Sequence, residues 1–401
     1  RWWKAYRRWR GAALTGAAVV AAGWFSGQLA SCGILGVFWM LAPLWAYHVS
    51  LPRRKEEPEP LSASQLLDVR LVARRTYHYF ERFVEPAHGY LPPDNVQLDP
   101  FKGVASRTSP TNMGLAMVSI VTGWYMGYSA MDTVLQKLEG MLQTMESLEK
   151  WKGHWFNWYD TVTRAPLPPR YISSVDSGNL LACLWMTDAL LLRALEVGPI
   201  LPGQIQGWAD TWTLHCIRRK VSEDTLSAQL RAAGSEAQMP ELAHRLQRAL
   251  KGEKEGWGGL LAAQLDALDK AGLLQKGAAW SDATRDRIMQ LRDRIKEACR
   301  MDLTALYDKK RGLFLIGLDP DGPVPEQGAC YDLMASEARI LSLVAIAKGD
   351  VPAEHWRRLA RPVALAGDGI SLWSWSGTMF EYLMPEIFMR SRPGTLLSDT
   401  N

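Results

Sequence analysis

The sequence predicts an all-α protein in which a membrane-embedded pair of helices precedes a larger helical domain. The first observation is a run of 42 residues, from Gly11 to Pro52, that contains no Asp, Glu, Lys or Arg. The second is the recurrence of apolar residues at helical spacing in long stretches after residue 64. The third is the scarcity of strand signals, of which RGLFLIGLD at 311–319 is the best.

The uncharged run is long enough for two passes through a bilayer, because about 20 apolar residues cross one. A turn at SGQLASCG would divide it into spans at 11–28 and 33–49, so residues 1–50 are predicted to form a transmembrane helical hairpin. Its basic flanks, RWWKAYRRWR and PRRK, would place both ends on the cytoplasmic side. A single span beside a buried helix is the alternative interpretation.

Residues 51–63, LPRRKEEPEPLSA, change abruptly to charge and proline, as linkers do. The domain that follows, 64–401, opens with a helix behind a Ser cap. The apolar stripe of this helix would contain Leu66, Val69, Val72, Ala73, Tyr77, Phe80 and Val84. Further helices are predicted at 112–128, 131–149, 177–195, 207–231, 239–251, 258–273, 281–308 and 331–348. Residues 200–300 are interpreted as a variable, charged section of solvated helices.

Composition argues against several kinds of function. The 46 Lys and Arg residues nearly balance the 42 Asp and Glu residues, which is too mild a net charge to indicate a nucleic-acid partner. The five cysteines form no C-x-x-C pair and the seven histidines have no metal-binding spacing. Since phosphate-binding and dinucleotide motifs are also absent from the sequence, we expect neither a metal nor a cofactor.

Three loop-rich segments combine flat rings with hydrogen-bonding side chains: RTSPTNMG (107–114), GHWFNWYDTVTRAPLPPRYISSVDSGNL (153–180) and SLWSWSGTMFEYLMP (371–385). Each leads into a predicted helix, and the candidate N-caps are Thr111, Ser177, and Ser376 or Thr378. Their polar groups would therefore gather at one end of the domain. His154 is interpreted as a hydrogen-bonding loop residue.

The rings in these segments could stack on sugars, and the polar side chains could bind sugar hydroxyl groups. The stacking candidates are Trp155, Trp158, Tyr159, Trp373 and Trp375, and the hydroxyl-binding candidates are Arg107, Asn157, Asp160, Asp176 and Asn179. The alternative is that the rings belong to the core and that the polar residues form turns and caps.

Glu337 is the strongest catalytic candidate. Apolar residues flank it at helical spacing in ACYDLMASEARILSLVAIAKGD, which predicts that its carboxylate lies on the apolar stripe of a helix. Burial there would raise its pKa toward the value that a general acid needs near neutral pH. An ion pair with a distant Arg or Lys is the alternative. Glu381 is a weaker candidate, which could equally be a structural partner of Arg390.

Several motifs together resemble the middle region of bacterial cyclic β-1,2-glucan synthases: RTSPTNMGL, GHWFNWYDT, LPPRYISSVDSGNL, YDLMASEAR, VAIAKGDVPAEHW and SWSGTMFEYLMP. The resemblance is dense over 65–195 and 303–401 and loose between 200 and 300. It implies a glycoamylase-like (α/α)6 barrel over 64–401, incomplete at its C-terminus, and a retaining transglycosylation that cyclises linear β-1,2-glucan. It also implies a bacterial inner-membrane protein with the barrel on the cytoplasmic side, and glycosyltransferase and phosphorylase-like domains in the same longer chain.

The resemblance also assigns site residues. Glu337 matches a catalytic glutamate and is assigned the acid/base role. Retaining chemistry needs a second carboxyl group about 5 Å away, which the family carries in a WGISES motif that this sequence does not contain. The predicted glucan-binding residues are Arg107, Asn112, Trp155, Asn157, Trp158, Tyr159, Asp160, Asp176, Asn179, Tyr331, Asp332, Trp375 and Glu381. Two alternatives are a non-catalytic glucan-binding or scaffolding module beside a membrane glycosyltransferase, and a membrane-anchored interaction protein that binds no sugar.

Overall fold

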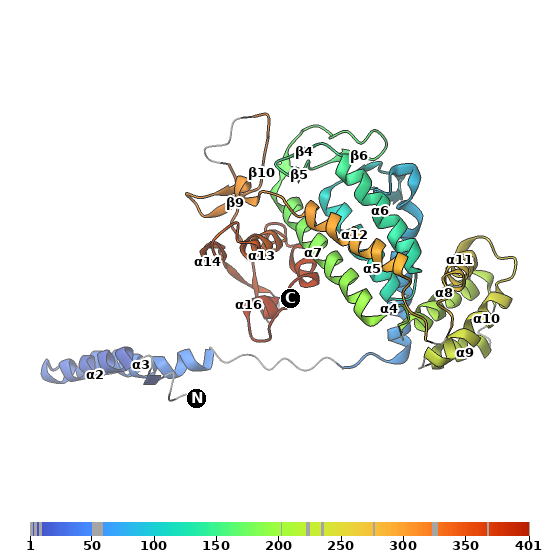
Figure 1. Cartoon of the computed structure of the whole chain (residues 1–401). Coiled ribbons are helices and arrows are strands. Elements are labelled where there is room, and N and C mark those ends of the chain that lie inside the picture. The colour runs from blue at the N-terminus through green and yellow to red at the C-terminus, as the bar shows by residue number, and fades with distance from the viewer. Residues whose placement is uncertain are drawn as a thin grey trace. The chain divides into compact units, whose positions relative to one another are not determined.

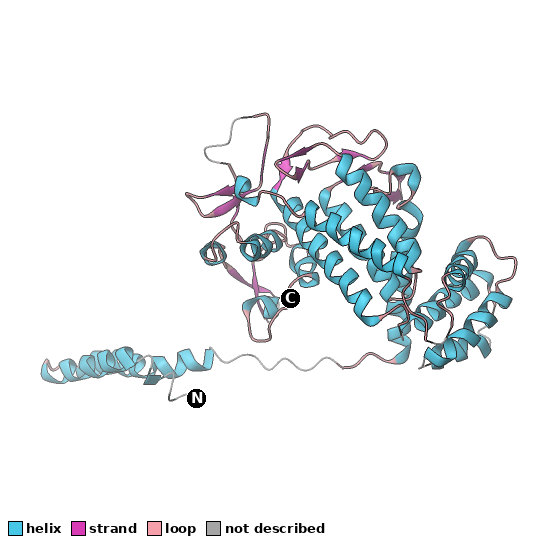
Figure 2. Cartoon of the chain, viewed as in Figure 1, coloured by secondary structure: helices cyan, strands magenta, loops and turns pink. Residues whose placement is uncertain are grey.

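The computed structural model consists mainly of helices, with short strands in the loops that join them (Figures 1 and 2). It falls into two compact units, Arg1–Pro60 and Leu61–Asn401. The residues that the structure describes are 3, 6–7, 10–49, 59–201, 203–221, 225–233, 236–275, 277–322, 328–366 and 369–400.

The first unit contains α2 (Arg10–Phe25) and α3 (Leu29–Val49), which pack closely against each other. A Cβ atom built on Gly16 would lie 2.5 Å from the Gly36 carbonyl oxygen, so only glycine allows the backbones this approach. The turn occupies 26–28, and helix replaces coil through most of the predicted SGQLASCG turn. Among the described residues, one stretch, Leu29–His48, is long and apolar enough to span a bilayer. α2 has 16 residues.

The second unit is built on two helices that are buried over much of their length, α5 (Pro110–Tyr125) and α7 (Ser174–Val197). Figure 1 shows α6 (Met131–Ser147) and α12 (Asp282–Ala298) beside them, and α7 also packs against α13 (Arg339–Lys348). The inner helix α5 is apolar nearly all round, whereas α6 buries one face, as expected of an inner and an outer layer.

The helix that opens this unit, α4 (Ala63–Phe83), begins with a capping box between Ser62 and Gln65, as its Ser cap predicts. The predicted apolar stripe is only partly correct. Tyr77 and Val84 are buried, but the side chains of Leu66, Val69 and Val72 are more than half exposed. The reason is that α4 turns its Arg70–Arg74 side toward α8 (Gly203–Arg219) and meets α5 mainly through its second half.

Residues 200–300 are not merely solvated helices, because they contain buried apolar side chains that continue the main core. The predicted helix 207–231 is divided into α8 and α9 (Thr225–Ala232), and α10 (Met239–Ala249) and α11 (Gly256–Lys270) follow. Their core residues include Trp208, Leu230, Leu246, Leu261 and Leu265.

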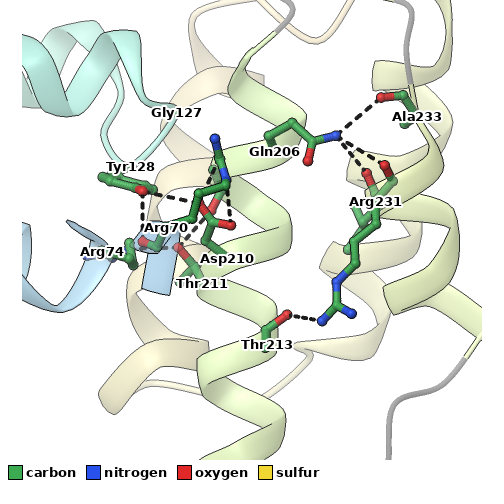
Figure 3. Close-up of polar contacts among 12 residues, drawn as sticks. Arg70, Arg74, Gly127, Tyr128, Gln206, Asp210, Thr211, Thr213, Arg231 and Ala233 are labelled. Carbon is green, nitrogen blue, oxygen red and sulfur yellow. Dashed lines mark hydrogen bonds and ion pairs between the residues drawn. The ribbon is translucent and has the colours of Figure 1, made fainter. Parts of the chain in front are cut away.

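A buried polar network fastens α8 to α4 (Figure 3). Arg70 donates twice to Asp210, at 3.0 and 2.7 Å, and Arg74 donates to Thr211 Oγ1 at 2.8 Å. Arg74 is almost fully buried, and its guanidinium also bonds both carboxylate oxygens of Glu81, at 2.8 and 3.0 Å. Rings of Tyr77, Tyr128 and Trp257 lie around that guanidinium, at 5.8, 5.1 and 4.9 Å from ring centroid to Cζ.

Short strands tie the loops together, so the prediction of an all-α protein is correct for the framework and wrong for the connections. Antiparallel pairs are formed by β1 (Val96–Leu98) and β2 (Phe101–Val104), β3 (Arg107–Thr108) and β6 (Tyr159–Asp160), β4 (Lys150–Trp151) and β5 (His154–Trp155), β7 (Ile172–Ser173) and β10 (Gly317–Leu318), and β12 (Val363–Ala366) and β13 (Gly369–Leu372). The order in the three-stranded sheet is β11 (Cys330–Tyr331), β9 (Leu313–Leu315), β8 (Tyr307–Asp308). The strand predicted at 311–319 is therefore confirmed as β9 and β10.

The remaining elements are short helices. Among them, α14 (Glu354–Arg358), α15 (Met379–Leu383) and α16 (Leu396–Thr400) follow α13, and 3₁₀ turns occupy Pro86–His88, Glu236–Gln238, Leu303–Leu306 and Met384–Ile387. The helix predicted at 281–308 ends at Ala298, and the one predicted at 331–348 begins only at Arg339. The later start of α13 leaves Glu337 outside the helix.

Candidate active site

Glu337 does not lie in a helix, as its flanking pattern predicts, but in the turn that leads from β11 into α13. The preceding segment cannot be helical because it pairs in parallel with the chain at Ala360: Met334 N donates to Ala360 O at 2.9 Å, and Ala360 N donates to Asp332 O. Burial of the neighbouring Ser336 and Ala338 nevertheless places Glu337 against the core. The prediction of a partly buried carboxyl group is therefore correct, although the secondary structure from which it was inferred is not.

The carboxyl group of Glu337 has a hydrogen-bond partner but no cationic one among the described residues. Asn179 Nδ2 donates to its Oε1 at 2.5 Å. Burial raises the pKa of Glu337 to about 7; the Asn179 hydrogen bond opposes this increase, and the charges of Asp176 and Glu381 add to it. The alternative prediction, an ion pair between Glu337 and an Arg or Lys, is therefore wrong for the described residues.

Asn179 belongs to a polar network that α5 and α7 form together. Its Nδ2 also donates to Thr111 Oγ1 at 3.1 Å, and the Thr111 hydroxyl donates to Asp176 Oδ1 at 2.6 Å. Asn157, with its amide in the orientation that its neighbours require, donates to Asp176 Oδ2 at 3.1 Å. Four predicted site residues, Asn157, Asp176, Asn179 and Glu337, are thus brought together.

Part of this network is not predicted by the sequence. Thr111 and Ser177 are candidate N-caps in the sequence, but α5 is capped by Ser109 and α7 by Ser173. Thr111 is therefore free to bond Asp176, and Ser177 bonds His154 Nδ1 at 2.9 Å, in keeping with the predicted hydrogen-bonding role of His154.

Tyr171 and Trp158 complete the surroundings of Asn157, since the Tyr171 hydroxyl and Trp158 Nε1 both donate to its amide oxygen at 2.9 Å. The predicted residue Tyr331 also lies close by: burial raises the pKa of its hydroxyl, and the negative charges of Glu337 and Asp176 raise it further. Its neighbour Asp332 has a buried Oδ1 atom with no hydrogen-bond partner among the described residues. Tyr171 lies within a motif that the sequence analysis quoted, but no local pattern distinguishes it.

The predicted residues Arg107 and Asn112 meet at Asp94, which the sequence analysis did not single out. Arg107 donates to Asp94 Oδ2 from Nε at 3.1 Å and from Nη2 at 2.9 Å, and Asn112 Nδ2 lies 3.4 Å from Asp94 Oδ1. The Arg107 guanidinium also lies over the ring of Trp158, 4.7 Å from the ring centroid. One face of this indole is therefore occupied by a cation.

Two of the predicted stacking rings belong to the core instead. Trp155 is 2% exposed and donates from Nε1 to Met145 O at 3.0 Å; Tyr159 is fully buried, and its hydroxyl donates to Glu149 O at 2.6 Å. The prediction that these rings stack on a sugar is wrong, because the β5 and β6 segments turn them inward. Asp160 forms a turn: its Oδ1 accepts from the backbone of Val162 and Thr163, at 2.8 and 2.7 Å.

Glu381 organises the third loop. Thr378 caps α15, as predicted, and Glu381 completes the capping box. Its carboxylate accepts hydrogen bonds from Ser374, Ser376 and Thr378 and from the backbone N–H of Trp375, and Arg390 is not among these donors. Burial raises the pKa of Glu381, but these hydrogen bonds outweigh it and hold the pKa below its usual value. The loop presents Trp373 and Trp375 with 59% and 58% of their surfaces exposed.

Comparison with known proteins bears on most of the chain. No protein-family model matches it. It is 35% identical over 403 aligned residues to the cyclic β-(1,2)-glucan synthase NdvB of Rhizobium meliloti (strain 1021), which covers 91% of this chain and 14% of that protein.

Among solved structures, a putative glucoamylase from Bacteroides fragilis NCTC 9343 is similar with a TM-score of 0.46 at 14% identity, over 82% of this chain and 60% of that one. An endo-β-1,2-glucanase from Chitinophaga pinensis has a TM-score of 0.43 at 13% identity, over 80% and 59%. The predicted resemblance is confirmed by the sequence comparison alone: this chain is similar, over nine-tenths of its length, to a limited segment of a much longer cyclic β-(1,2)-glucan synthase.

Proposed function

We propose that this chain acts on β-1,2-glucan by glycosyl transfer, as the segment of a longer synthase that closes a linear glucan into a ring with retention at the anomeric carbon. The observation that carries the proposal is Glu337, a partly buried carboxyl group with a pKa near 7 and no cationic partner among the described residues. Perturbed carboxyl groups of this kind mark acid/base sites. The similarity to the glucan synthase supports the choice of substrate.

In this reaction Glu337 is the general acid/base. A carboxyl group with a pKa near 7 is present in both protonation states at neutral pH, so it can give a proton to a leaving oxygen and later accept one from the attacking hydroxyl group. A retaining mechanism also needs a carboxylate nucleophile about 5 Å away. The family that the sequence resembles carries that group in a WGISES motif, which this sequence does not contain.

The glucan would lie along the polar network and the third loop. Trp375 offers an exposed ring for a sugar face, and Trp158, which is partly exposed, would lie beside it along the glucan. Arg107, Asn112, Tyr331 and Asp332 supply polar groups nearby. The buried rings of Trp155 and Tyr159 have no part in this proposal.

The test is product analysis with linear β-1,2-glucan and the full-length synthase that carries this segment, as wild type and as Glu337→Gln. We expect cyclic product to fall about 10²- to 10⁴-fold, because the substitution removes acid/base catalysis and preserves shape. Glucan binding by the 401-residue chain, followed by tryptophan fluorescence, should be retained in both forms. Cyclisation at the normal rate by the variant would contradict the catalytic role and leave a binding or scaffolding module, and no binding at all would leave an interaction protein.

We also propose that α2 and α3 form a transmembrane hairpin in the bacterial inner membrane, with the second unit on the cytoplasmic side. The uncharged sequence, the exposed rings of Trp24, Phe25, Phe38 and Trp45, and the basic residues on both flanks support this arrangement. Glycosyltransferase and phosphorylase-like domains of the same longer chain would then be its partners.

A further inference from the structure

A directional chain of hydrogen bonds joins two carboxyl groups of the candidate site. Asn179 Nδ2 has two hydrogen atoms; one is donated to Glu337 Oε1 at 2.5 Å and the other to Thr111 Oγ1 at 3.1 Å. The single hydroxyl hydrogen of Thr111 is donated to Asp176 Oδ1 at 2.6 Å. Each hydrogen in the chain therefore has one acceptor, and Asn179 is the donor to Glu337.

The amide of Asn179 cannot be reversed without breaking this chain. Asp176 is an acceptor throughout, since Thr111 N, at 3.3 Å, and Asn157 also donate to it, and it lies in the first turn of α7, where the helix dipole favours a negative charge. The Thr111 hydroxyl is thus committed to Asp176 and has no hydrogen to offer Asn179. A reversed amide would bring its oxygen against an acceptor, at a position where Asn179 is fully buried.

The geometry points to Asn179 as the positioning residue of Glu337, with Thr111 fixing the amide, so that the exchangeable proton of Glu337 resides on Oε2. Oε1 already accepts the Asn179 hydrogen, and Oε2 has no hydrogen-bond partner among the described residues. In the proposed function, on which this role rests, Oε2 is the atom that presents the proton to the glycosidic oxygen. Neither Asn179 nor Thr111 needs to touch the reacting atoms.

The charges around Glu337 are consistent with this arrangement. Asp176 on α7 and Glu381 on α15 act on it as negative charges, and the hydroxyl of Tyr331 on β11 lies close to it. The Asn179 hydrogen bond is the one contact that favours the ionised form, and its loss would shift Glu337 toward the protonated form.

The test is a pH titration of the Glu337 carboxyl carbon by ¹³C NMR in the complete 401-residue chain, with the signal assigned by its absence in Glu337→Gln. We expect Asn179→Leu to raise the pKa of Glu337 by about 1 to 2, because it removes a hydrogen bond to a charged group. Thr111→Val should also raise the pKa of Glu337, because the Asn179 amide is then free to turn its oxygen toward Glu337. Thr111→Ser retains the hydroxyl and should restore the wild-type titration.

Thr187→Val is the matched control, because Thr187 on α7 is a buried threonine like Thr111 on α5, but among the described residues its hydroxyl bonds Cys183 O of its own helix, at 2.8 Å, and not the site. Circular dichroism establishes whether each variant is folded. If Thr111→Val does not fold, Asn179→Leu and Thr111→Ser still test whether Asn179 positions Glu337. A wild-type titration in Asn179→Leu, or an equal shift in Thr187→Val, overturns the inference. Because the titration needs no glucan, its failure is distinguishable from a failure of the proposed function, which the cyclisation assay reports.

Discussion

At the scale of single residues, the site holds a carboxyl group under conditions that oppose its charge. Glu337 has lost part of its hydration, faces two other carboxylates, and receives one hydrogen bond in return. Glu381, in the same region, is surrounded by hydrogen-bond donors and has a lowered pKa instead. The surroundings of these two glutamates thus shift their pKa values in opposite directions, raising that of Glu337 and lowering that of Glu381. Such a difference separates a carboxyl group that can act as an acid from one that stays ionised.

This environment predicts a pH-dependent stability cost at Glu337. Because its pKa is about 7 in the folded chain against 4.5 for a free glutamate, the folded state binds the proton more tightly. The free energy of unfolding should therefore fall as the pH rises from about 4.5 to 7 and stay lower above that range, by at most roughly 3 kcal/mol. Glu337→Gln lacks this loss, so its melting temperature relative to wild type should increase between pH 4 and pH 8.

Glu297→Gln serves as the control for that series, because the Glu297 side chain is 67% exposed. If the difference between wild type and Glu337→Gln is the same at pH 4 and pH 8, Glu337 does not titrate in the buried environment described above.

At the scale of elements, the attachment of α8 to α4 depends on a buried charge. Arg74 donates one hydrogen bond to Thr211 (Figure 3) and two to Glu81, and three rings surround its guanidinium. Such a network contributes little compared with an apolar core of equal volume, but loss of one partner leaves the other charge buried and unpaired. The network therefore fixes how α4 meets α8.

Arg74→Met should accordingly lower the free energy of unfolding by about 3 to 5 kcal/mol, the usual cost of breaking a buried pair. Chemical denaturation followed by circular dichroism measures it. Arg75→Met is the matched control, since the neighbouring side chain is exposed and should change stability by less than about 0.5 kcal/mol. Equal effects of the two substitutions would show that the network does not hold the elements together.

At the scale of the whole molecule, the hairpin and the helical domain are separate compact units. Glycine at positions 16 and 23 allows α2 to approach α3 closely, at Gly36 and Cys32. A hairpin places Gly11, at the start of α2, on the cytoplasmic side of the membrane, whereas a single span through α3 places it on the outer side. Both arrangements place Gln28, in the turn, on the outer side.

Labelling by a membrane-impermeant maleimide distinguishes the two arrangements. In full-length protein with its native cysteines replaced by serine, we expect Gln28→Cys to react in intact cells and Gly11→Cys to react only after lysis. Both residues are exposed on the protein itself, so access from the outside of the membrane decides the outcome. Reaction of Gly11→Cys in intact cells would favour the single span.

Much of the framework was predictable from the sequence because helical periodicity is local. The predictions for α5, α6, α10 and α11 are close to the observed helices, since the pattern repeats within each one. The prediction at 331–348 failed at its start because the partner that keeps residues 332–334 extended, Ala360, lies outside any local window.

Local sequence patterns are enough to predict the helical content and to identify the uncharged N-terminal run, and they single out Asn157, Asp176, Asn179 and Glu337 as candidate site residues. Local patterns do not predict how these residues are hydrogen-bonded, that Trp155 and Tyr159 point into the core, or that Thr111 bonds Asp176 and does not cap α5. The physical reason is distance along the chain: Asn179 and Glu337 are 158 positions apart, and Thr111 and Asp176 are 65 apart. Hydrogen bonds between such residues exist only once α5, α7 and the turn before α13 have packed together.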